Sequence, residues 1–187
     1  MAMDNFREEV VIKQKRGMET AMYAMANVMM VIFGVLAVMT FSSISMFLST
    51  EGFSANTIFN IVALLVDGGM CAFLFLRKDR LKMEYEYTFT NGQMDFAQVY
   101  NNKKRKALGT MNIRNVEACG MVASGSFQRY ITMQGVKRTN WFLNREADLL
   151  YFYFQKDGSK RMIIIEPSEE MIVLIKKYLA QGVWQVN

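Results

Sequence analysis

Two long apolar stretches, residues 20–50 and 52–76, dominate the first half of the chain. Glu51 lies between them and Asp67 lies inside the second, and neither stretch contains another charged residue. A helix needs about 20 apolar residues to cross the core of a bilayer, and both stretches exceed that length. The pattern therefore predicts a two-helix transmembrane hairpin over residues 20–76.

The hydrophobic period changes to two after Met83. Tyr85, Tyr87 and Phe89 alternate with polar residues, which is typical of a half-buried strand, and Asn91-Gly92 predicts a tight hairpin turn. Further strands are expected from Met94 to Tyr100 and over residues 105–113, 116–121, 149–154 and 161–165, with an alternating piece at 127–133 in the polar stretch 122–140. These short segments predict a mainly antiparallel β domain.

A C-terminal helix is expected to close this domain. Ser168 is a good N-cap, Glu169 and Glu170 suit the first turn of a helix, and Gly182 suits its end. The expected organisation is a cytoplasmic lead-in over residues 1–19, the hairpin over 20–76, a basic juxtamembrane linker over 77–82 and a cytoplasmic domain over 83–187. The fold class is α+β.

The segment before the first apolar stretch allows two interpretations. Residues 4–16 carry Phe6, Val10 and Val11 among many charged residues. The segment is either a solvated lead-in or a short amphipathic helix that lies on the membrane surface.

Basic residues indicate the orientation of the hairpin. The net charge is +5, and Arg77, Lys78, Arg80 and Lys82 follow the second apolar stretch directly. The short connection between the stretches has no Lys or Arg. Because Lys and Arg near the ends of a span favour the cytoplasmic side, we expect a two-span cell-membrane protein with both termini in the cytoplasm.

Asp67 is the most unusual residue of the hairpin, because an ionisable group in the membrane is costly. Asn60 lies one heptad earlier on the same face, and Asn27 is expected to reach the depth of Asp67 and to form a hydrogen bond with it. Two functions remain open for Asp67: a structural, protonated carboxyl, or part of an ion path in an oligomer.

The composition argues against an enzyme. The chain has no histidine, and its two cysteines, Cys71 and Cys119, lie in different predicted regions. No catalytic residues, metal ligands or cofactor site can be assembled from the motifs, and no disulfide is expected. The small positive charge of the domain also argues against nucleic-acid binding.

The densest charged run of the domain is Lys103, Lys104, Arg105 and Lys106. With Arg77, Lys78, Arg80 and Lys82, these residues could hold the domain against anionic headgroups, since each contributes about 1 kcal/mol near such a surface. The alternative is that residues 103–106 are a solvated hairpin tip.

The chain resembles a known family in two stretches. The first is Met3-Asp4-Asn5-Phe6-Arg7-Glu8-Glu9-Val10-Val11 with Lys13, Lys15 and Arg16; the second runs from Tyr151-Phe152-Tyr153-Phe154 through Gly158, Lys160, Ile163 to Pro167 and Glu169-Glu170-Met171 to Tyr178. With the hairpin, these stretches are similar to an uncharacterised bacterial family of short membrane proteins with a PH-like domain. The resemblance implies a strongly bent antiparallel sheet, as a barrel or sandwich, with one end closed by the C-terminal helix. It transfers no catalytic or ligand residues.

The resemblance also raises the question of phosphoinositide binding. PH domains that bind these lipids carry Lys and Arg in the loop between their first two strands. In this chain that loop is expected to be the tight Asn91-Gly92 turn, whose small size and lack of basic residues argue against phosphoinositide binding by the usual route.

Three hypotheses for function follow from the sequence. The protein is a membrane-anchored adaptor that binds a protein or peptide through its PH-like domain. Alternatively, the hairpin associates with itself or serves as an accessory or regulatory subunit of a membrane complex, or the protein is a small transporter subunit that uses Asp67. We favour the adaptor, with the lipid bilayer and a protein partner or self-association as its expected contacts.

Overall fold

The computed structural model describes residues 5–186, and the chain divides into two compact units. One unit consists of residues 15–82. The other joins the N-terminal residues up to Gln14 to the chain from Met83 onward. Two segments that are distant in sequence therefore fold together, although the whole helical unit lies between them.

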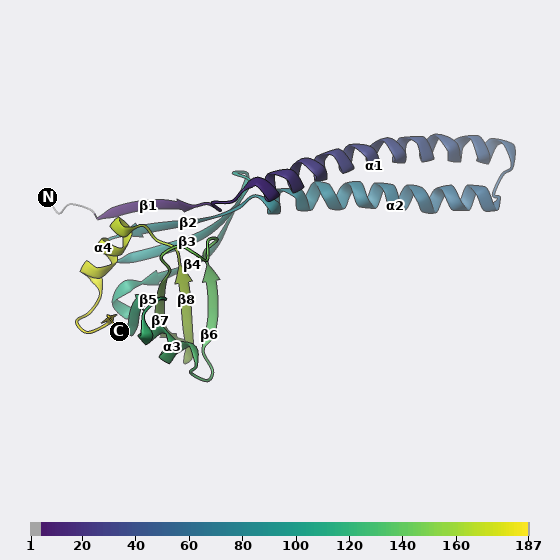
Figure 1. Ribbon diagram of the computed structural model, residues 1–187. Coiled ribbons are helices and arrows are strands. Elements are labelled where there is room, and N and C mark those ends of the chain that lie inside the picture. Colours follow the sequence, from purple (N-terminus) through teal and green to yellow (C-terminus); the bar gives the residue numbers. More distant parts are fainter. Residues whose placement is uncertain (1–4, 187) are drawn as a thin grey trace. The chain divides into compact units, whose positions relative to one another are not determined.

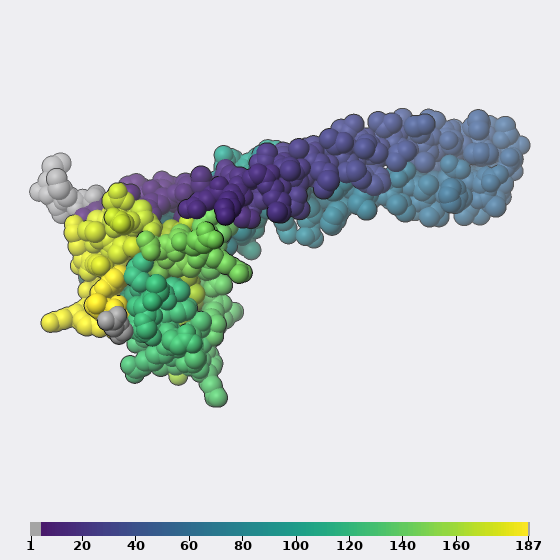
Figure 2. Space-filling view, viewed as in Figure 1, coloured from purple at the N-terminus to yellow at the C-terminus, as the bar shows by residue number. Residues whose placement is uncertain are grey.

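The helical unit is a hairpin of two long helices that lie side by side (Figures 1 and 2). Helix α1 spans Gly17–Thr50, helix α2 spans Ala55–Arg77, and the 3₁₀ helix η1 (Lys78–Leu81) follows α2. Ser54 is the N-cap of α2, because its side chain accepts a hydrogen bond from the Thr57 backbone N–H. Both helices are long and apolar enough to cross a membrane.

Several hydroxyl side chains of α1 form hydrogen bonds inside their own helix. The hydroxyls of Thr40, Ser42 and Ser43 donate hydrogen bonds to backbone carbonyls four residues earlier. A buried or lipid-facing hydroxyl with such a bond needs no partner from another segment. The hydroxyls of α1 are therefore compatible with an apolar surrounding.

The first sheet of the other unit is antiparallel, in the order β1-β2-β3-β4 (Figure 1). Its strands are β1 (Phe6–Val11), β2 (Met83–Thr90), β3 (Gln93–Tyr100) and β4 (Lys104–Asn112). The turn between β2 and β3 has positive φ at both Asn91 and Gly92, as a type I′ turn requires. The predicted hairpin over residues 83–100 is confirmed.

Strand β1 corrects the expectation for the N-terminal segment. The segment is neither a solvated lead-in nor an amphipathic helix, because Phe6–Val11 pairs with β2 from Phe6 opposite Thr90 to Val11 opposite Tyr85. Exposed and less exposed side chains alternate along β1, with period two. The helical hairpin is therefore inserted between two neighbouring strands of one sheet.

The second sheet has the order β6-β8-β7-β5-β9. Its strands are β5 (Ala118–Met121), β6 (Lys137–Trp141), β7 (Leu150–Lys156), β8 (Ser159–Ile165) and β9 (Trp184–Gln185). Strands β6 and β8 are parallel, and so are β5 and β9. The expectation of an antiparallel barrel is thus corrected: the unit has two separate sheets that do not close into a barrel, although the α+β class is confirmed.

The polar stretch before β6 folds differently from the expected alternating piece. Helix α3 spans Gly125–Ile131, and its residues Phe127 and Tyr130 place their rings against Tyr151 of β7 at centroid distances of 5.4 and 5.8 Å. Two apolar side chains three residues apart lie on one face of a helix. The short helix covers the outer face of the second sheet.

The C-terminal helix α4 spans Glu169–Tyr178, with Ser168 as its N-cap. The Ser168 hydroxyl accepts a hydrogen bond from the Met171 backbone N–H, as predicted for this residue. The helix ends before Gly182, which has a φ of +80° in the turn that leads to β9.

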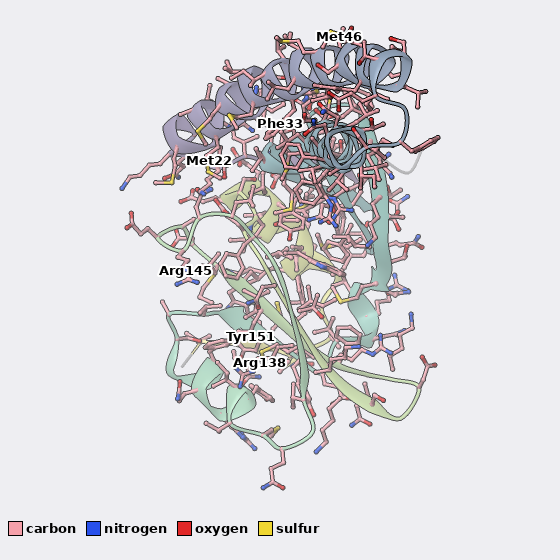
Figure 3. The ribbon with its side chains drawn as sticks, turned by 90° about the vertical axis from the view of Figure 1, so that its right-hand side faces the viewer. Met22, Phe33, Met46, Arg138, Arg145 and Tyr151 are labelled. Carbon is pink, nitrogen blue, oxygen red and sulfur yellow. The ribbon has the colours of Figure 1, made fainter. Side chains whose placement is uncertain are left out.

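Two apolar clusters explain the continuous apolar run of β7. One cluster lies between the two sheets and α4, and includes Phe152 and Ile165; the other lies under α3 and includes Tyr151 and Tyr153. Figure 3 shows Tyr151 among the strands of the second sheet. Because β7 is buried on both faces, its sequence does not alternate.

Candidate functional site

The basic run 103–106 lies at the connection between β3 and β4 and at the start of β4. A left-handed turn at residues 101–102 precedes it, with φ values of 49° and 53°. The guanidinium Nε of Arg105 lies 2.7 Å from Glu86 Oε2, so this charge is paired across the sheet. The run is an exposed hairpin tip, and its contact with lipid headgroups stays a prediction.

Three of the four predicted juxtamembrane cations lie near aromatic rings of the helical unit. Lys82 Nζ lies 4.3 Å from the centre of the Tyr23 ring, and Lys78 Nζ lies 6.0 Å from it. Arg77 lies over Phe73 at 5.5 Å, while Arg80 is exposed. Tyrosine and basic side chains together are typical of the interface between a bilayer and water.

The expected hydrogen bond between Asn27 and Asp67 is replaced by another one. Lys78 Nζ donates to Asn27 Oδ1 at 2.8 Å, so Asn27 lies level with the end of α2. Asp67 precedes Lys78 by roughly 16 Å of helix at 1.5 Å per residue. The register excludes the expected pair, because Cys71 Sγ, four residues after Asp67, donates to the Met30 carbonyl and so places Asp67 beyond Met30 along α1.

Asn60 also forms its hydrogen bond within its own helix, since its Nδ2 donates to the Asn56 carbonyl at 2.8 Å. Asp67 is half-buried in α2. A functional role for Asp67, Asn60 or Asn27 stays a prediction.

Glu9 connects β1 to the beginning of α4. Its carboxylate accepts hydrogen bonds from the Ser168 backbone N–H at 3.0 Å, from the Ser168 hydroxyl, and from Arg7 Nε at 2.6 Å. Arg7 also reaches Glu170 Oε2 at 3.2 Å. The N-terminal strand is thereby bound to the helix that closes the domain.

A second polar cluster holds the chain just after β1. Asn144 Nδ2 donates to the Ile12 carbonyl at 2.9 Å, and Asn144 Oδ1 accepts from the Gln14 backbone N–H at 2.9 Å. The Glu166 carboxylate accepts from the backbone N–H groups of Leu143 and Asn144. The amide of Asn144 therefore bonds to the backbone as a neighbouring strand would.

These two clusters border an open groove of about 570 Å³, which we call the β1 groove. It runs between β1, the start of α4 and the segment before β7, and its lining includes Val10, Ile12, Asn144, Asp148, Glu169 and Ile172. Strand β1 is the outermost strand of its sheet, so it has a strand partner on one side among the described residues. The groove thus follows the edge of a sheet.

The buried side chains of the domain offer little for catalysis. Cys119 is fully buried, and burial raises the pKa of its thiol, an effect that nearby Lys176 opposes only in part. Burial also raises the pKa of the Tyr87 hydroxyl, which donates to the Trp141 carbonyl. Within residues 5–186, no three His, Cys, Asp or Glu residues lie close enough to hold a metal ion.

Sequence reasoning missed the β1 groove for an identifiable reason. The groove combines β1, residues 144–148 and the start of α4, which are far apart in the sequence. The residues around Glu9 and Ser168 carry no pattern that would indicate a hydrogen bond between these two side chains. Ser168 itself was recognisable as a helix cap, whereas Glu9 stands in a run of three charged residues that does not distinguish it from its neighbours.

The insertion of the hairpin changes one inference about lipids. Because β1 is the first strand, Asn91-Gly92 connects the second and third strands of the sheet. The connection between the first two strands is the hairpin itself, with basic residues at 77–82. The size of the Asn91-Gly92 turn therefore gives no reason against phosphoinositide binding.

Comparison with known proteins agrees with this architecture. Residues 3–185 match the model of a family described as a bacterial PH-like domain, DUF6106, and this range includes both β1 and the inserted hairpin. No curated protein and no solved structure matched the chain. PH-like domains are generally non-catalytic binding domains. Since the match covers nearly the whole sequence, the chain belongs to the bacterial PH-like domain family DUF6106.

Proposed function

We propose that the protein is a membrane-anchored, non-enzymatic binding protein whose PH-like domain captures an extended, basic segment of a partner protein in the β1 groove. The observation that carries the proposal is that this groove of about 570 Å³ follows the outer edge of β1. An extended peptide can add to such an edge through backbone hydrogen bonds, and neighbouring pockets then select its side chains.

The lining of the groove favours a basic segment with apolar residues. Asp148 and Glu169 are exposed carboxylates, whereas Arg7, the one cation of the lining within the described part of the chain, is engaged by Glu9 and Ser168. Val10 is 51% exposed, so its side chain is available for an apolar contact. Charge complementarity and apolar contact together define the partner's chemistry.

The helical hairpin is the proposed anchor in the bilayer. Its apolar surface needs lipid, and the basic residues at 77–82 favour the cytoplasmic side for the ends of both helices. The domain is then connected to the membrane twice, through the residues after Val11 and those before Met83. Such a domain would hold its partner close to the inner surface of the cell membrane.

Site-specific photocrosslinking in cells tests the groove. A photoreactive residue replaces Val10 in the full-length protein, and the matched control replaces Val173, which is 54% exposed on α4 but does not line the groove. Mass spectrometry then identifies the crosslinked segment of the partner. We expect a basic stretch that crosslinks at position 10 and not at position 173.

Charge reversal completes this test. Asp148→Lys and Glu169→Lys, combined in one chain, should abolish the adduct at position 10, because a basic segment would be repelled. The proposal is wrong if the adduct survives the reversal, or if positions 10 and 173 capture the same segments equally well.

We also propose a second candidate function, in which the hairpin assembles with other membrane helices as an accessory subunit of a membrane complex. The residue that favours it is Asp67. Asp67 is half-buried, and a Cβ added at the adjacent Gly68 or Gly69 would meet no atom within 4 Å, which leaves room for another helix. Asp67→Leu should then remove crosslinks between spans of different chains. Crosslinks that persist unchanged in this variant would exclude a role of Asp67 in assembly.

A further inference from the structure

A second hollow lies where the two sheets fail to close. Strand β4 is the outermost strand of the first sheet, and β6 is the outermost strand of the second. Between them is a cleft of about 210 Å³, which we call the β4–β6 cleft. It shares no lining residue with the β1 groove. Its volume equals that of roughly seven liquid water molecules, so it suits a small chemical group.

The charged side chains that line the cleft are all basic. Lys137 of β6, Lys156 of β7 and Arg161 of β8 contribute to its wall, and no carboxylate among residues 5–186 lines it. The carboxylate of Asp157 is 3.9 Å from Arg161 Nη2, but its side chain is 79% exposed and lies outside the lining. Three cations at one small cavity focus a positive potential on any group inside it.

One donor at this cleft is buried without a partner. The Nε atom of Arg161 is inaccessible to water and makes no hydrogen bond within the described residues, although the side chain as a whole is 39% exposed. Because Nε has no accessible surface, a ligand in the cleft would meet the charge and the other donors of this guanidinium. The guanidinium is the side chain best suited to bind a phosphate through several donors.

The remaining lining is mainly apolar and includes aromatic rings and two threonine hydroxyl groups. Phe96 and Trp141 contact each other, with ring centroids 4.7 Å apart, and Phe154 also lines the cleft. The half-buried Thr139 adds a hydroxyl, whereas the hydroxyl of Thr110 already donates to Asp95. The cleft therefore combines an apolar floor with several donors for an anion.

We propose that the β4–β6 cleft binds a phosphate monoester that carries a small apolar group. The phosphate lies against Arg161, Lys137 and Lys156, and the apolar group lies on the rings of Phe96 and Trp141. A dianionic phosphate matches three cations better than a single carboxylate does. Its source is either a soluble compound or a phosphomonoester lipid headgroup.

Fluorescence of Trp141 reports binding directly. The chain has two tryptophans, so Trp184→Phe leaves Trp141 as the single reporter in the full-length protein, held in nanodiscs of neutral phosphatidylcholine. Phenyl phosphate is the probe. Phenol and sodium chloride at matched ionic strength are the controls for the apolar part and for charge screening. We expect a saturable change in emission with phenyl phosphate and none with phenol.

Two variants distinguish binding in the cleft from a general attraction of the anion to the positively charged surface. Arg161→Gln removes the guanidinium charge from the wall of the cleft and should weaken phenyl phosphate binding about 10- to 100-fold, as expected for a charged hydrogen bond. Lys160→Gln removes an exposed neighbouring charge outside the cleft and should change binding less than about twofold. Lys137 is exposed on the edge strand β6, so Lys137→Gln should leave the fold intact. This variant should also weaken binding, and it therefore tests the site even if Arg161→Gln has a folding defect.

A second experiment, with lipids, distinguishes a soluble phosphate compound from a lipid headgroup as the ligand. If nanodiscs that contain phosphatidic acid change the emission of Trp141 and phenyl phosphate competes with that change, the ligand is a headgroup. If only free phenyl phosphate acts, the ligand is soluble. The proposal is overturned if phenyl phosphate leaves Trp141 unchanged, or if Arg161→Gln and Lys160→Gln weaken binding equally.

Discussion

The helical hairpin and the PH-like domain use apolar side chains in opposite ways. Within residues 15–82, which are all described, Ala26 and Thr57 are the buried residues of α1 and α2, while large side chains such as Phe59 point outward. In the domain, Phe152 and Ile165 are completely buried. The hairpin therefore exposes most of its large apolar side chains, whereas the domain buries many of its own in an apolar interior.

The largest expected effect compares one chemical change in the two units. Phe152→Ala should lower the free energy of unfolding of the domain by about 3–5 kcal/mol, because it removes a large buried ring and leaves a cavity. Phe59, 73% exposed on α2, is the matched control, and Phe59→Ala should leave the stability of the domain unchanged. Urea unfolding of the full-length protein in micelles, followed by tryptophan fluorescence, measures both.

Equal destabilisation by Phe152→Ala and Phe59→Ala would contradict this comparison. It would mean that the domain cannot fold without specific packing in the hairpin. Both tryptophans of the chain lie in the domain, so the fluorescence signal reports the unfolding of that unit.

A smaller effect is expected in β1, the strand that precedes the hairpin. Glu9→Ala removes the acceptor for the Ser168 N–H and hydroxyl and for Arg7, and should cost about 1–3 kcal/mol in the unfolding of the domain. Glu8→Ala, the adjacent exposed position, should change this free energy by less than about 0.5 kcal/mol. If both variants are equally stable, Glu9 does not connect β1 to α4.

The chain between the domain and α1 should respond locally to a third change. Asn144→Ala removes the bonds to Ile12 and Gln14, and should raise the hydrogen-exchange rate of the Gln14 amide roughly tenfold. Arg145→Ala, at an exposed neighbouring position, is the control. An unchanged Gln14 amide in Asn144→Ala would show that residues 12–14 are held by other contacts.

The sequence predicted the elements whose causes are local. The apolar length of the two stretches predicted α1 and α2, Asn91-Gly92 predicted the turn between β2 and β3, and Ser168 predicted the start of α4. In each case the determining residues lie within the element or directly beside it. Local chemistry was therefore sufficient for these parts of the fold.

Pairing between distant segments could not be predicted in the same way. The segment Phe6–Val11 carries Arg7, Glu8 and Glu9, and its sequence fits a solvated segment or helix until the pairing of Val11 with Tyr85 is known. Strand propensity depends on such neighbours more than helix propensity does. For the same reason, the sequence did not predict the parallel strand pairs, the β4–β6 cleft or the β1 groove.

The register of the hairpin is a similar case, and it leads to a fourth prediction. Asn27→Ala removes the bond from Lys78 and should weaken the contact between α1 and α2 by about 0.6 kcal/mol. Asn60→Ala is the control, because Asn60 bonds to Asn56 of its own helix. Unfolding in SDS, followed by energy transfer between dyes at Gly17 and Arg80, measures the difference. Equal effects would mean that the bond between Lys78 and Asn27 does not stabilise the hairpin.

The smallest expected effect concerns how acid changes the stability of two helix N-termini, those of α4 and α2. The pKa of Glu170 is lowered, first by the hydrogen bond to its own backbone N–H at the start of α4, then by Ser168 and by Arg7. Since the folded pKa is depressed, Glu170 stabilises the domain above the pKa of its unfolded state, and this contribution is lost as pH falls through the folded pKa. The first turn of α2 has no acidic residue, so acid should spare that helix start.

Glu170→Gln should therefore reduce the loss of domain stability between about pH 7 and about pH 3, while the adjacent Glu169→Gln is the control. Urea unfolding at a series of pH values measures the slope for each variant. The effect should also shrink in high salt, because the carboxylate is exposed and its attraction to Arg7 is screened. A slope that is the same in both variants and in the unmodified chain would show that the acid dependence of the domain arises elsewhere. In that case, the charged start of α4 would be as indifferent to acid as the uncharged start of α2.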